Sequence, residues 1–314
     1  MKFKNIILKI HIFFIAFFLF SCLCRAEENG ALNIPISDDL QHAGFLTSYK
    51  RHYPYGFKIL RDGSLYLVNT PKKSVMQFDF MGRHIKTYSG KDENFSSCTD
   101  ICFDNDGMLY VAPLESMQVI KLDMLSNEIS RFGSYGTGES ALKSIYQIEI
   151  AGGKKLFVQD TLSGKINVYS SAGTFIKKIE CNVAGFYLTA KGQLIYMRHS
   201  PACGYSINFL DSNARTPRKI FALGMNAVAG LEFIGCDQKG NFYMAAPIGH
   251  PFSSKEKEVI VYNSSAIRFS NYRVKNSALG RQFFIFGDGS LYSAEPDTPN
   301  GSDSRPTKIS IKKY

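Results

Sequence analysis

The stretch from residue 145 to residue 179 reads IYQIEIAGGKKLFVQDTLSGKINVYSSAGTFIKKI and predicts four short strands in succession. Its apolar or alternating runs are separated by Gly, Asp and Ser residues, which is the usual chemistry of tight turns. No run between two turns is long enough for a helix. A sheet of four such strands cannot bury both of its faces alone, so we expect it to pack against further copies of itself.

Those copies are present along the chain. In each copy a turn glycine comes just before an apolar, aromatic second strand, and a third strand follows; five of the six copies also have a fourth strand. The turn glycines are Gly63, Gly107, Gly153, Gly192, Gly240 and Gly289. Their intervals are 44, 46, 39, 48 and 49 residues. A period in the forties built from four strands is typical of a β-propeller, so the sequence predicts an all-β protein with six blades.

The sixth repeat reaches Tyr314 without a fourth strand. An unfinished blade would leave an exposed sheet edge. We therefore expect an N-terminal strand to close the last blade, with residues 44–49 as the candidate segment. In this interpretation the propeller spans residues 43–314.

The N-terminus has the pattern of an export signal. Lys2, Lys4 and Lys9 precede the apolar run IHIFFIAFFLFSCLC at residues 10–24. That run is short for a membrane span and is followed by candidate cleavage sites. We expect residues 1–21 to form a signal peptide.

Two cleavage sites are compatible with this signal peptide. Residues 19–22, LFSC, resemble a bacterial lipobox, which implies cleavage before Cys22 and lipidation of that residue. Alternatively, an ordinary signal peptidase cleaves after Ala26, with small residues at the positions that matter. Residues 22–42 are then a tether. The expected location is the periplasm or the outer surface of a bacterium, with membrane attachment through the lipid.

The charge of the chain does not indicate a nucleic-acid partner. The formal net charge is +10. Residues 1–21 contain three lysines and no acidic residue, so their removal leaves about +7, a moderately basic surface. The remaining basic residues are scattered rather than gathered in a stripe, and an exported protein rarely meets nucleic acid.

The cysteines after residue 26 are Cys98, Cys102, Cys181, Cys203 and Cys236, an odd number that cannot pair completely. Cys98 and Cys102 lie four residues apart in a predicted strand, about 13 Å from each other. That separation is beyond disulfide reach, and we expect both thiols to be buried on the same side of the sheet. The sequence does not decide whether Cys181 and Cys203 form a disulfide bond. No Cys or His spacing indicates a zinc site.

The third repeat resembles a known family. It runs from LFVQD at residues 156–160 through GKINVY at 164–169 to Ala172-Gly173, and it is similar to an NHL-type repeat. The chain from about residue 43 to residue 314 resembles the six-bladed NHL/TolB-like propellers of bacterial secreted lipoproteins. That superfamily includes binding scaffolds, peptide-amidating lyases, streptogramin-lyase-like enzymes and calcium-dependent lactonases. The resemblance therefore implies the fold and leaves the function open.

Loop lengths suggest where a ligand could bind. In a propeller, the fourth-to-first and second-to-third connections gather on one face. The second-to-third connections are short in the first three repeats and long in the last three, at residues 198–204, 247–257 and 295–306. Long loops in a compact domain are often functional, so we expect blades four to six to form one side of a binding surface. The candidate ligand-binding residues are Tyr53, Tyr55, Arg198, His199, His250, Phe252 and Asp297. The simpler interpretation of the two histidines is that they are exposed loop residues.

The innermost strands carry polar residues that are expected to face the central channel. They are Lys58, Asp100, Glu149, Glu232 and Gln282. Such residues can hold ordered water, or they can bind an ion. Three of them, Asp100, Glu149 and Glu232, are the metal ligands of the alternative hypothesis and could serve a calcium enzyme, although they lie at different offsets from their turn glycines. A zinc enzyme would need histidines at matching positions in several blades, and the histidines after residue 26 occupy unlike places. The chain has no nucleophile elbow and no phosphate-binding loop ahead of a helix.

The sequence therefore favours an exported, lipid-anchored β-propeller that acts as a non-catalytic binding or interaction module at the bacterial envelope. Its expected partner is an unidentified protein, peptide or glycan, with no cofactor. The alternative hypothesis is a propeller enzyme, a lyase or a lactonase-like hydrolase, with Ca²⁺ or Zn²⁺ in the central channel.

Overall fold

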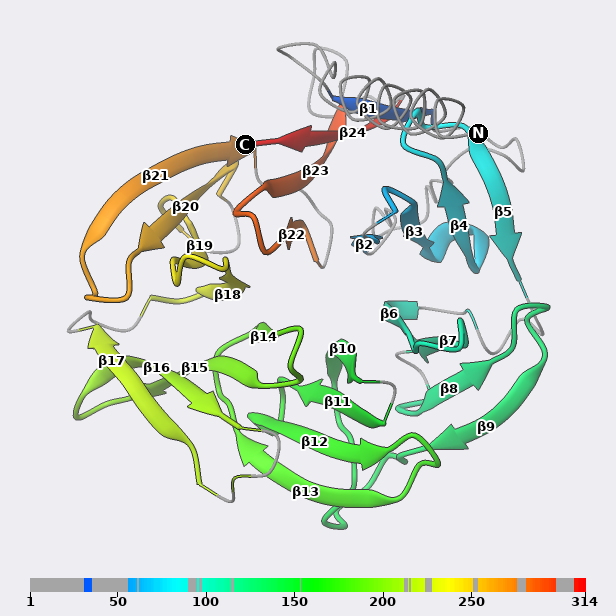
Figure 1. Ribbon diagram of the computed structural model, residues 1–314, viewed down its shortest axis with the longest axis horizontal. Coiled ribbons are helices and arrows are strands. Elements are labelled where there is room, and N and C mark those ends of the chain that lie inside the picture. The colour runs from blue at the N-terminus through cyan, green and yellow to red at the C-terminus, as the bar shows by residue number, and fades with distance from the viewer. Residues whose placement is uncertain are drawn as a thin grey trace, which may run out of the picture.

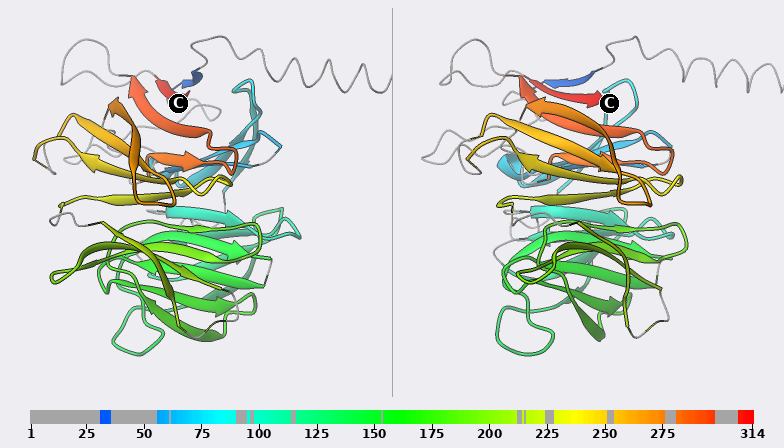
Figure 2. Two further views of the ribbon diagram at one scale, coloured as in Figure 1. Left: turned by 60° about the vertical axis from the view of Figure 1, so that its left-hand side comes forward. Right: turned by 90° about the vertical axis from the view of Figure 1, so that its left-hand side faces the viewer.

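The computed structural model describes residues 31–35, 56–60, 62–89, 95, 98–113, 116–152, 154–211, 214, 216–223, 228–250, 254–275, 281–297 and 308–314. These residues form six four-stranded antiparallel sheets arranged in a ring around a central channel (Figure 1). Seen from the side, the sheets stand as blades that cross the thickness of the ring (Figure 2). The predicted six-bladed β-propeller is confirmed.

Each of blades one to five is a meander whose first strand lies innermost and whose fourth strand lies at the rim. Blade one is β2 (Gly56–Ile59), β3 (Leu65–Asn69), β4 (Ser74–Phe78) and β5 (His84–Tyr88), with a short 3-10 turn η1 (Thr70–Lys72). Blade two is β6 (Cys98–Phe103), β7 (Leu109–Pro113), β8 (Val119–Leu122) and β9 (Glu128–Phe132). Blade three is β10 (Ile145–Ala151), β11 (Lys155–Asp160), β12 (Lys165–Ser170) and β13 (Phe175–Glu180).

The second half of the ring repeats this order. Blade four is β14 (Phe186–Leu188), β15 (Leu194–Ser200), β16 (Gly204–Leu210) and β17 (Arg218–Leu223). Blade five is β18 (Glu232–Cys236), β19 (Phe242–Pro247), β20 (Glu256–Tyr262) and β21 (Arg268–Lys275). Blade six is β22 (Phe283–Ile285), β23 (Leu291–Asp297), β24 (Lys308–Lys313) and, as its outermost strand, β1 (Leu32–Pro35).

The ring is closed by an N-terminal strand, as predicted, but the predicted segment was wrong. Strand β1 pairs antiparallel with β24, from Leu32 opposite Ile311 to Pro35 opposite Lys308. It therefore occupies the edge that residues 44–49 were expected to fill, and those residues lie outside the described part of the chain. The closing strand falls within the stretch predicted as a tether. Its alternating pattern, with Leu32 and Ile34 on one face, is too short to stand out in a sequence.

The repeated turns explain the spacing of the sequence motif. In blade two, Asp104 accepts hydrogen bonds from backbone N–H groups of the first-to-second turn, and the Tyr110 hydroxyl donates to its other oxygen at 3.1 Å. Blade five repeats this contact between Asp237 and Tyr243 at 3.2 Å. Gly107 between Asp104 and Tyr110 has φ of 76°, a left-handed conformation that favours glycine. The Asp-x-x-Gly-x-x-Tyr spacing is thus one structural unit.

The hydrophobic core is divided into six clusters, one at each interface between neighbouring blades. The cysteines belong to these clusters. A bulge between Cys98 and Ile101 places Cys98 between blades one and two and Cys102 between blades two and three, so the prediction that they share a side was wrong. Both are buried, as expected. Cys181 and Cys203 are both free thiols, and burial raises the pKa of Cys181 to about 12. The bridge left open for them does not form.

Among the described residues, no helix has the length and apolar character needed to cross a bilayer.

Removing the side chain that holds the closing strand should destabilise the whole ring. Ile34 is completely buried between blade six and blade one, beside Phe57 and Ile309. We expect Ile34→Ala to lower the free energy of unfolding by about 2–5 kcal/mol, because it leaves a cavity in a close-packed core. Denaturant unfolding measures this, with the exposed Leu125→Ala as the control. Equal stability of the two variants would show that β1 does not close the ring.

Candidate functional site

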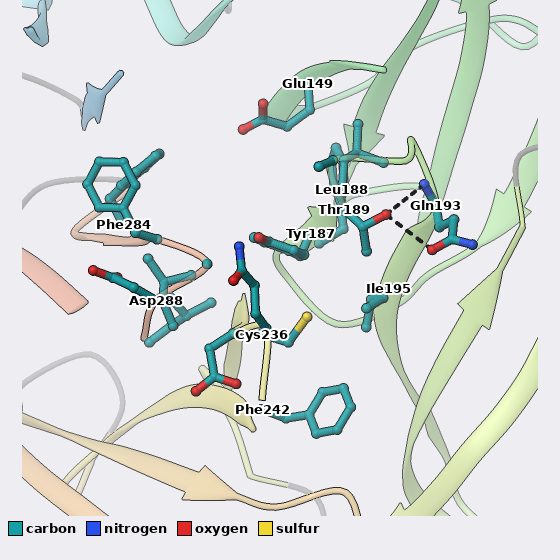
Figure 3. A pocket seen from close by; sticks show the side chains of 18 of the residues that line it. Glu149, Tyr187, Leu188, Thr189, Gln193, Ile195, Cys236, Phe242, Phe284 and Asp288 are labelled. Carbon is teal, nitrogen blue, oxygen red and sulfur yellow. Dashed lines mark hydrogen bonds between the residues drawn. The ribbon is translucent and has the colours of Figure 1, made fainter. Parts of the chain in front are cut away.

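A cavity of about 900 Å³ opens at the centre of the ring. The first-to-second turns of blades four, five and six form its wall, through residues such as Thr189, Gln238 and Asp288 (Figure 3). Blades one and three contribute Lys58 and Glu149 at its inner end. A cavity of this size is within the range of sites that bind small organic molecules or short peptides.

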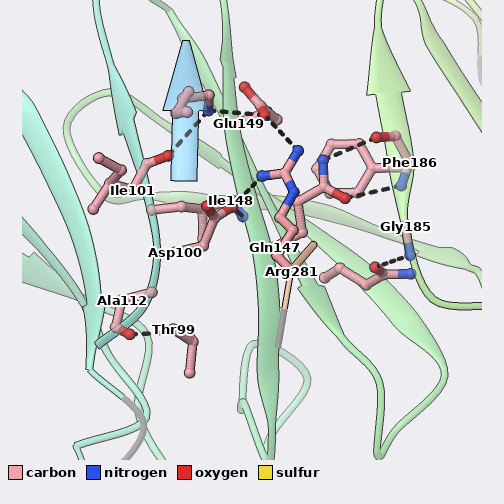
Figure 4. Close-up of polar contacts among 12 residues, drawn as sticks. Thr99, Asp100, Ile101, Ala112, Gln147, Ile148, Glu149, Gly185, Phe186 and Arg281 are labelled. Carbon is pink, nitrogen blue, oxygen red and sulfur yellow. Dashed lines mark hydrogen bonds and ion pairs between the residues drawn. The ribbon is translucent and has the colours of Figure 1, made fainter. Parts of the chain in front are cut away.

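Lys58, Glu149 and Arg281 line the inner end of the cavity. Asp100 lies behind them and pairs with Arg281. We call the four charged side chains Lys58, Asp100, Glu149 and Arg281 the channel lattice. The Lys58 ammonium lies 2.8 Å from the Glu149 carboxylate. The Arg281 guanidinium lies 2.8 Å from Asp100 and 3.4 Å from Glu149 (Figure 4). Arg281 lies next to blade six, so it ties that blade to blades two and three across the channel. The two positive and two negative charges cancel.

Backbone groups complete the hydrogen bonding of the channel lattice. Lys58 donates to the carbonyl of Ile101 at 3.0 Å, and Asp100 accepts from the N–H of Ile148 at 2.8 Å. Burial raises the pKa of Asp100, against the opposing effect of Arg281 and Lys58. Burial also acts to raise the pKa of Glu149, but Lys58 and Arg281 together hold it below its ordinary value. Glu149 is therefore ionised at neutral pH and paired.

Two buried glutamines fix the strand that carries much of the cavity wall. The Gln147 amide exchanges two hydrogen bonds with the backbone of Phe186, at 2.9 and 3.0 Å, at the start of β14 (Figure 4). Gln159 accepts from the N–H of Gly185 at 2.8 Å. Gly185 has φ of 89°, and a Cβ there would lie 1.9 Å from the carbonyl oxygen of Phe233. Only glycine allows blades four and five to approach so closely.

Strand β14, held in this way, presents Tyr187 and Leu188 to the cavity. Both side chains are partly exposed. Across the cavity, Phe284 and Phe286 of blade six pack edge to face with ring centroids 5.2 Å apart. Phe242 of blade five lies below them in the view of Figure 3. The walls are therefore largely aromatic and aliphatic.

Polar side chains stand around these walls. Thr189 and Gln193 are hydrogen-bonded to each other (Figure 3). Asp288 is exposed, and hydrogen bonds from Ser290 hold its pKa below the ordinary value. Lys191 is exposed on the opposite wall, in blade four. The mouth thus offers one negative and one positive group on either side of an apolar pocket.

Three of the predicted ligand-binding residues are described by the structure, and they lie outside the cavity. Arg198 and His199 are in β15, which continues to Ser200, so the long loop predicted at 198–204 is a tight turn between two extended strands. The His199 ring packs 4.7 Å from Tyr205. His250 is exposed in the turn that follows β19. Because turns alternate between the two faces, these residues lie on the face opposite the cavity mouth.

The other predicted ligand-binding residues are not placed. Tyr53, Tyr55 and Phe252 lie outside the described residues. Asp297 ends β23, and its side chain lies outside the described part of the structure. The structure therefore places Arg198, His199 and His250 and does not test the rest of this predicted set.

The carboxylates considered as metal ligands are engaged with cations. Asp100 and Glu149 meet at Arg281, whereas Glu232 at the start of β18 lies 3.7 Å from Lys257. In the described ranges no three His, Cys, Asp or Glu side chains are grouped so that they could hold a metal ion. Calcium needs several oxygen ligands that converge, so these residues do not fit a Ca²⁺ or Zn²⁺ site.

Sequence reasoning missed Arg281 and the face on which the cavity opens. Opposite charges on inner strands, at Lys58, Asp100 and Glu149, were visible, but nothing in the sequence says which of them meet. Arg281 lies two residues before the apolar run FFIF, which begins at residue 283. A cation at the start of an innermost strand was the signal that could have indicated its place in the channel.

No protein-family model matches this sequence, and a comparison with curated proteins gives no match. Solved structures are similar in fold. A virginiamycin B lyase from Staphylococcus aureus has a TM-score of 0.56 and 9% identity, over 91% of this chain and 100% of the other. A gluconolactonase-like protein has a TM-score of 0.54 and 14% identity, over 90% and 92%. A member of the DUF4221 family from Bacteroides vulgatus has a TM-score of 0.55 and 13% identity, over 90% and 95%. Such low identities show the propeller fold alone.

Breaking the channel lattice should cost more than breaking a surface ion pair. Arg281→Met leaves two carboxylates with Lys58 as the remaining cation of the channel lattice, and we expect a loss of about 3–5 kcal/mol in the free energy of unfolding. Arg83→Met is the control, because the Arg83 side chain, which lies 2.7 Å from Asp79, is 77% exposed. A loss of at most about 1 kcal/mol is expected there. Equal losses in the two variants, measured by denaturant unfolding, would contradict a structural role for the channel lattice.

Proposed function

We propose that this chain is an exported, lipid-anchored β-propeller of the NHL/TolB-like type that binds a short peptide, free or part of a partner protein, without transforming it. The observation that carries the proposal is the cavity of about 900 Å³, with aromatic walls and a charge-neutral inner end. Ligand sites of this kind are mostly apolar, with a few placed polar groups.

A peptide fits this cavity better than a glycan. Sugars need many hydrogen-bonding side chains, and several polar groups of the wall already bond within the protein. Gln147 bonds the backbone of Phe186, and Thr189 bonds Gln193. An apolar or aromatic side chain would pack against Tyr187, Leu188 and Phe284. The opposite charges of Lys191 and Asp288 at the mouth suit the two ends of a short peptide.

The chemistry of the wall supports binding without catalysis. General acid–base catalysis is most effective when the pKa of the catalytic group lies near the working pH. Burial raises the pKa of Cys236 to about 12, and the pKa of Asp288 is lowered. Glu149 is held in the channel lattice. The described lining residues include no histidine. A lyase or lactonase-like activity with a divalent ion is the alternative, and it would appear as turnover in the test below.

The envelope location rests on the sequence of the N-terminus. A lysine-flanked apolar run is followed by LFSC, and β1 begins ten residues after Cys22. A fully extended chain of that length spans about 35 Å. A lipid on Cys22 would therefore keep blade six close to the membrane, in the periplasm or on the outer surface.

Filling the cavity should abolish ligand binding. The chain has no tryptophan, so Leu188→Trp both fills the pocket and adds a fluorescent reporter. Peptides that bind are first identified because they raise the melting temperature of the wild-type protein, since a ligand stabilises only the state that binds it. We expect these peptides to lose at least about tenfold in affinity for the Leu188→Trp variant, because the larger side chain fills the pocket. Leu162→Trp, at a position that is 73% exposed, is the control and should bind normally.

The same screen separates the alternatives. A library of short peptides, a set of glycans, Ca²⁺ and Zn²⁺ are each tested by thermal shift and calorimetry, and every binder is checked for conversion to a product. Stabilisation by glycans alone would replace the peptide. Conversion of a ligand, or a stoichiometric metal, would favour the enzyme. Unchanged binding by a folded Leu188→Trp protein would place the site elsewhere.

A further inference from the structure

The third-to-fourth turns of blades one and two end in large apolar side chains. Phe80 and Met81 are 62% and 64% exposed, and Met124 and Leu125 are 58% and 81% exposed. The same turns in blades three and five read Ser-Ala and Ser-Ser, at residues 171–172 and 264–265. The apolar tips are therefore not a requirement of the repeat.

The turns themselves do not need these side chains. Asp79 accepts hydrogen bonds from the backbone N–H groups of Met81 and Arg83, and this closes the turn of blade one. Asp123 does the same in blade two. The aspartates hold the backbone, and the apolar side chains project into solvent. Exposed apolar groups that do not stabilise the fold commonly mark a contact surface.

The two tips belong to one surface. Lys86 of β5 in blade one donates to the carbonyl oxygen of Met124 in blade two, which joins the neighbouring turns. Ile85 on β5 and Ile129 on β9 are also exposed and extend the apolar surface along the rim. We call these residues the rim patch: Phe80, Met81, Ile85, Met124, Leu125 and Ile129. Arg83 and Lys86 are the cations within it, and Arg83 is paired with Asp79 at 2.7 Å.

The rim patch lies beside the strand that follows the N-terminal segment. A Cβ at Gly82 would lie 2.7 Å from the Cδ1 of Leu32, so β1 runs against the tip of blade one. Strands β1 and β5 are both at the outer edge of the ring (Figure 1). The lipid expected on Cys22 is ten residues before Leu32. An anchored chain would thus hold Leu32, which lies against the tip of blade one, within about 35 Å of the bilayer.

We propose that the rim patch docks the propeller onto the lipid surface to which the chain is anchored. Phe80, Met81, Met124 and Leu125 enter the interface between headgroups and acyl chains, and Arg83 and Lys86 meet lipid phosphates. This inference rests on the envelope location in the proposed function. Docking adds a second attachment to the lipid anchor and fixes the orientation of the ring. The cavity mouth opens on the same face as the apolar turns.

The absence of tryptophan makes a direct test possible. Leu125→Trp is introduced into the full chain, which is matured in cells and reconstituted into vesicles of phosphatidylethanolamine and phosphatidylglycerol. A second set of vesicles contains brominated acyl chains, which quench tryptophan at the interface. The control is Phe269→Trp, at a position that is 55% exposed on β21 and on the far side of the ring from β5 (Figure 1). It tests whether position, rather than exposure of an apolar residue, decides the quenching.

We expect brominated lipid to quench the tryptophan of the Leu125→Trp variant at least about twofold more than that of the Phe269→Trp variant, with a blue-shifted emission. Replacement of Phe80, Met81 and Met124 by serine should reduce that quenching without changing the melting temperature. Equal or no quenching in the two variants, in protein that floats with the vesicles, would overturn docking and leave the anchor intact. Protein that does not float with vesicles would overturn the envelope location and the docking together.

Discussion

The structure depends on one cross-channel interaction, the contact of Arg281 with Asp100 and Glu149. A propeller has no core that all blades share, because each hydrophobic cluster joins two neighbours. Arg281 instead reaches from blade six to blades two and three. The guanidinium keeps its charge at any relevant pH, and its fork can contact two carboxylates. Lys58 balances the remaining charge, and hydrogen bonds with the backbone of Ile101 and Ile148 offset part of the desolvation cost of the buried charges.

The candidate site is a consequence of how the channel is filled. The lattice closes the inner end of the cavity, and Gln147 fixes the backbone of β14 beside it. Strand β14 then holds Tyr187 and Leu188 toward the opening. Gln147 and Glu149 are thus engaged within the protein, and the apolar side chains of the wall face the cavity. The proposed binding of a peptide rests on these walls.

The repeat of turn glycines and alternating strands was sufficient to predict six blades, because these features are local. Five of the six predicted turn glycines, from Gly63 to Gly289, have the positive φ that a tight turn favours, and Gly153 lies outside the described residues. Closure by an N-terminal strand was also predictable from the missing fourth strand. Its position at Leu32–Pro35 was not, because four residues carry too little pattern. The cavity and Arg281 were missed because both depend on which inner strands face each other across the ring.

Arg281 and Asp100 should be energetically coupled across the channel. A double-mutant cycle measures this with Arg281→Met, Asp100→Asn and the double variant, using denaturant unfolding at neutral pH. We expect a coupling energy of about 1–3 kcal/mol, because each single change leaves a buried charge without its partner. Stability changes that add within about 0.5 kcal/mol would contradict it and would reduce the lattice to an incidental contact.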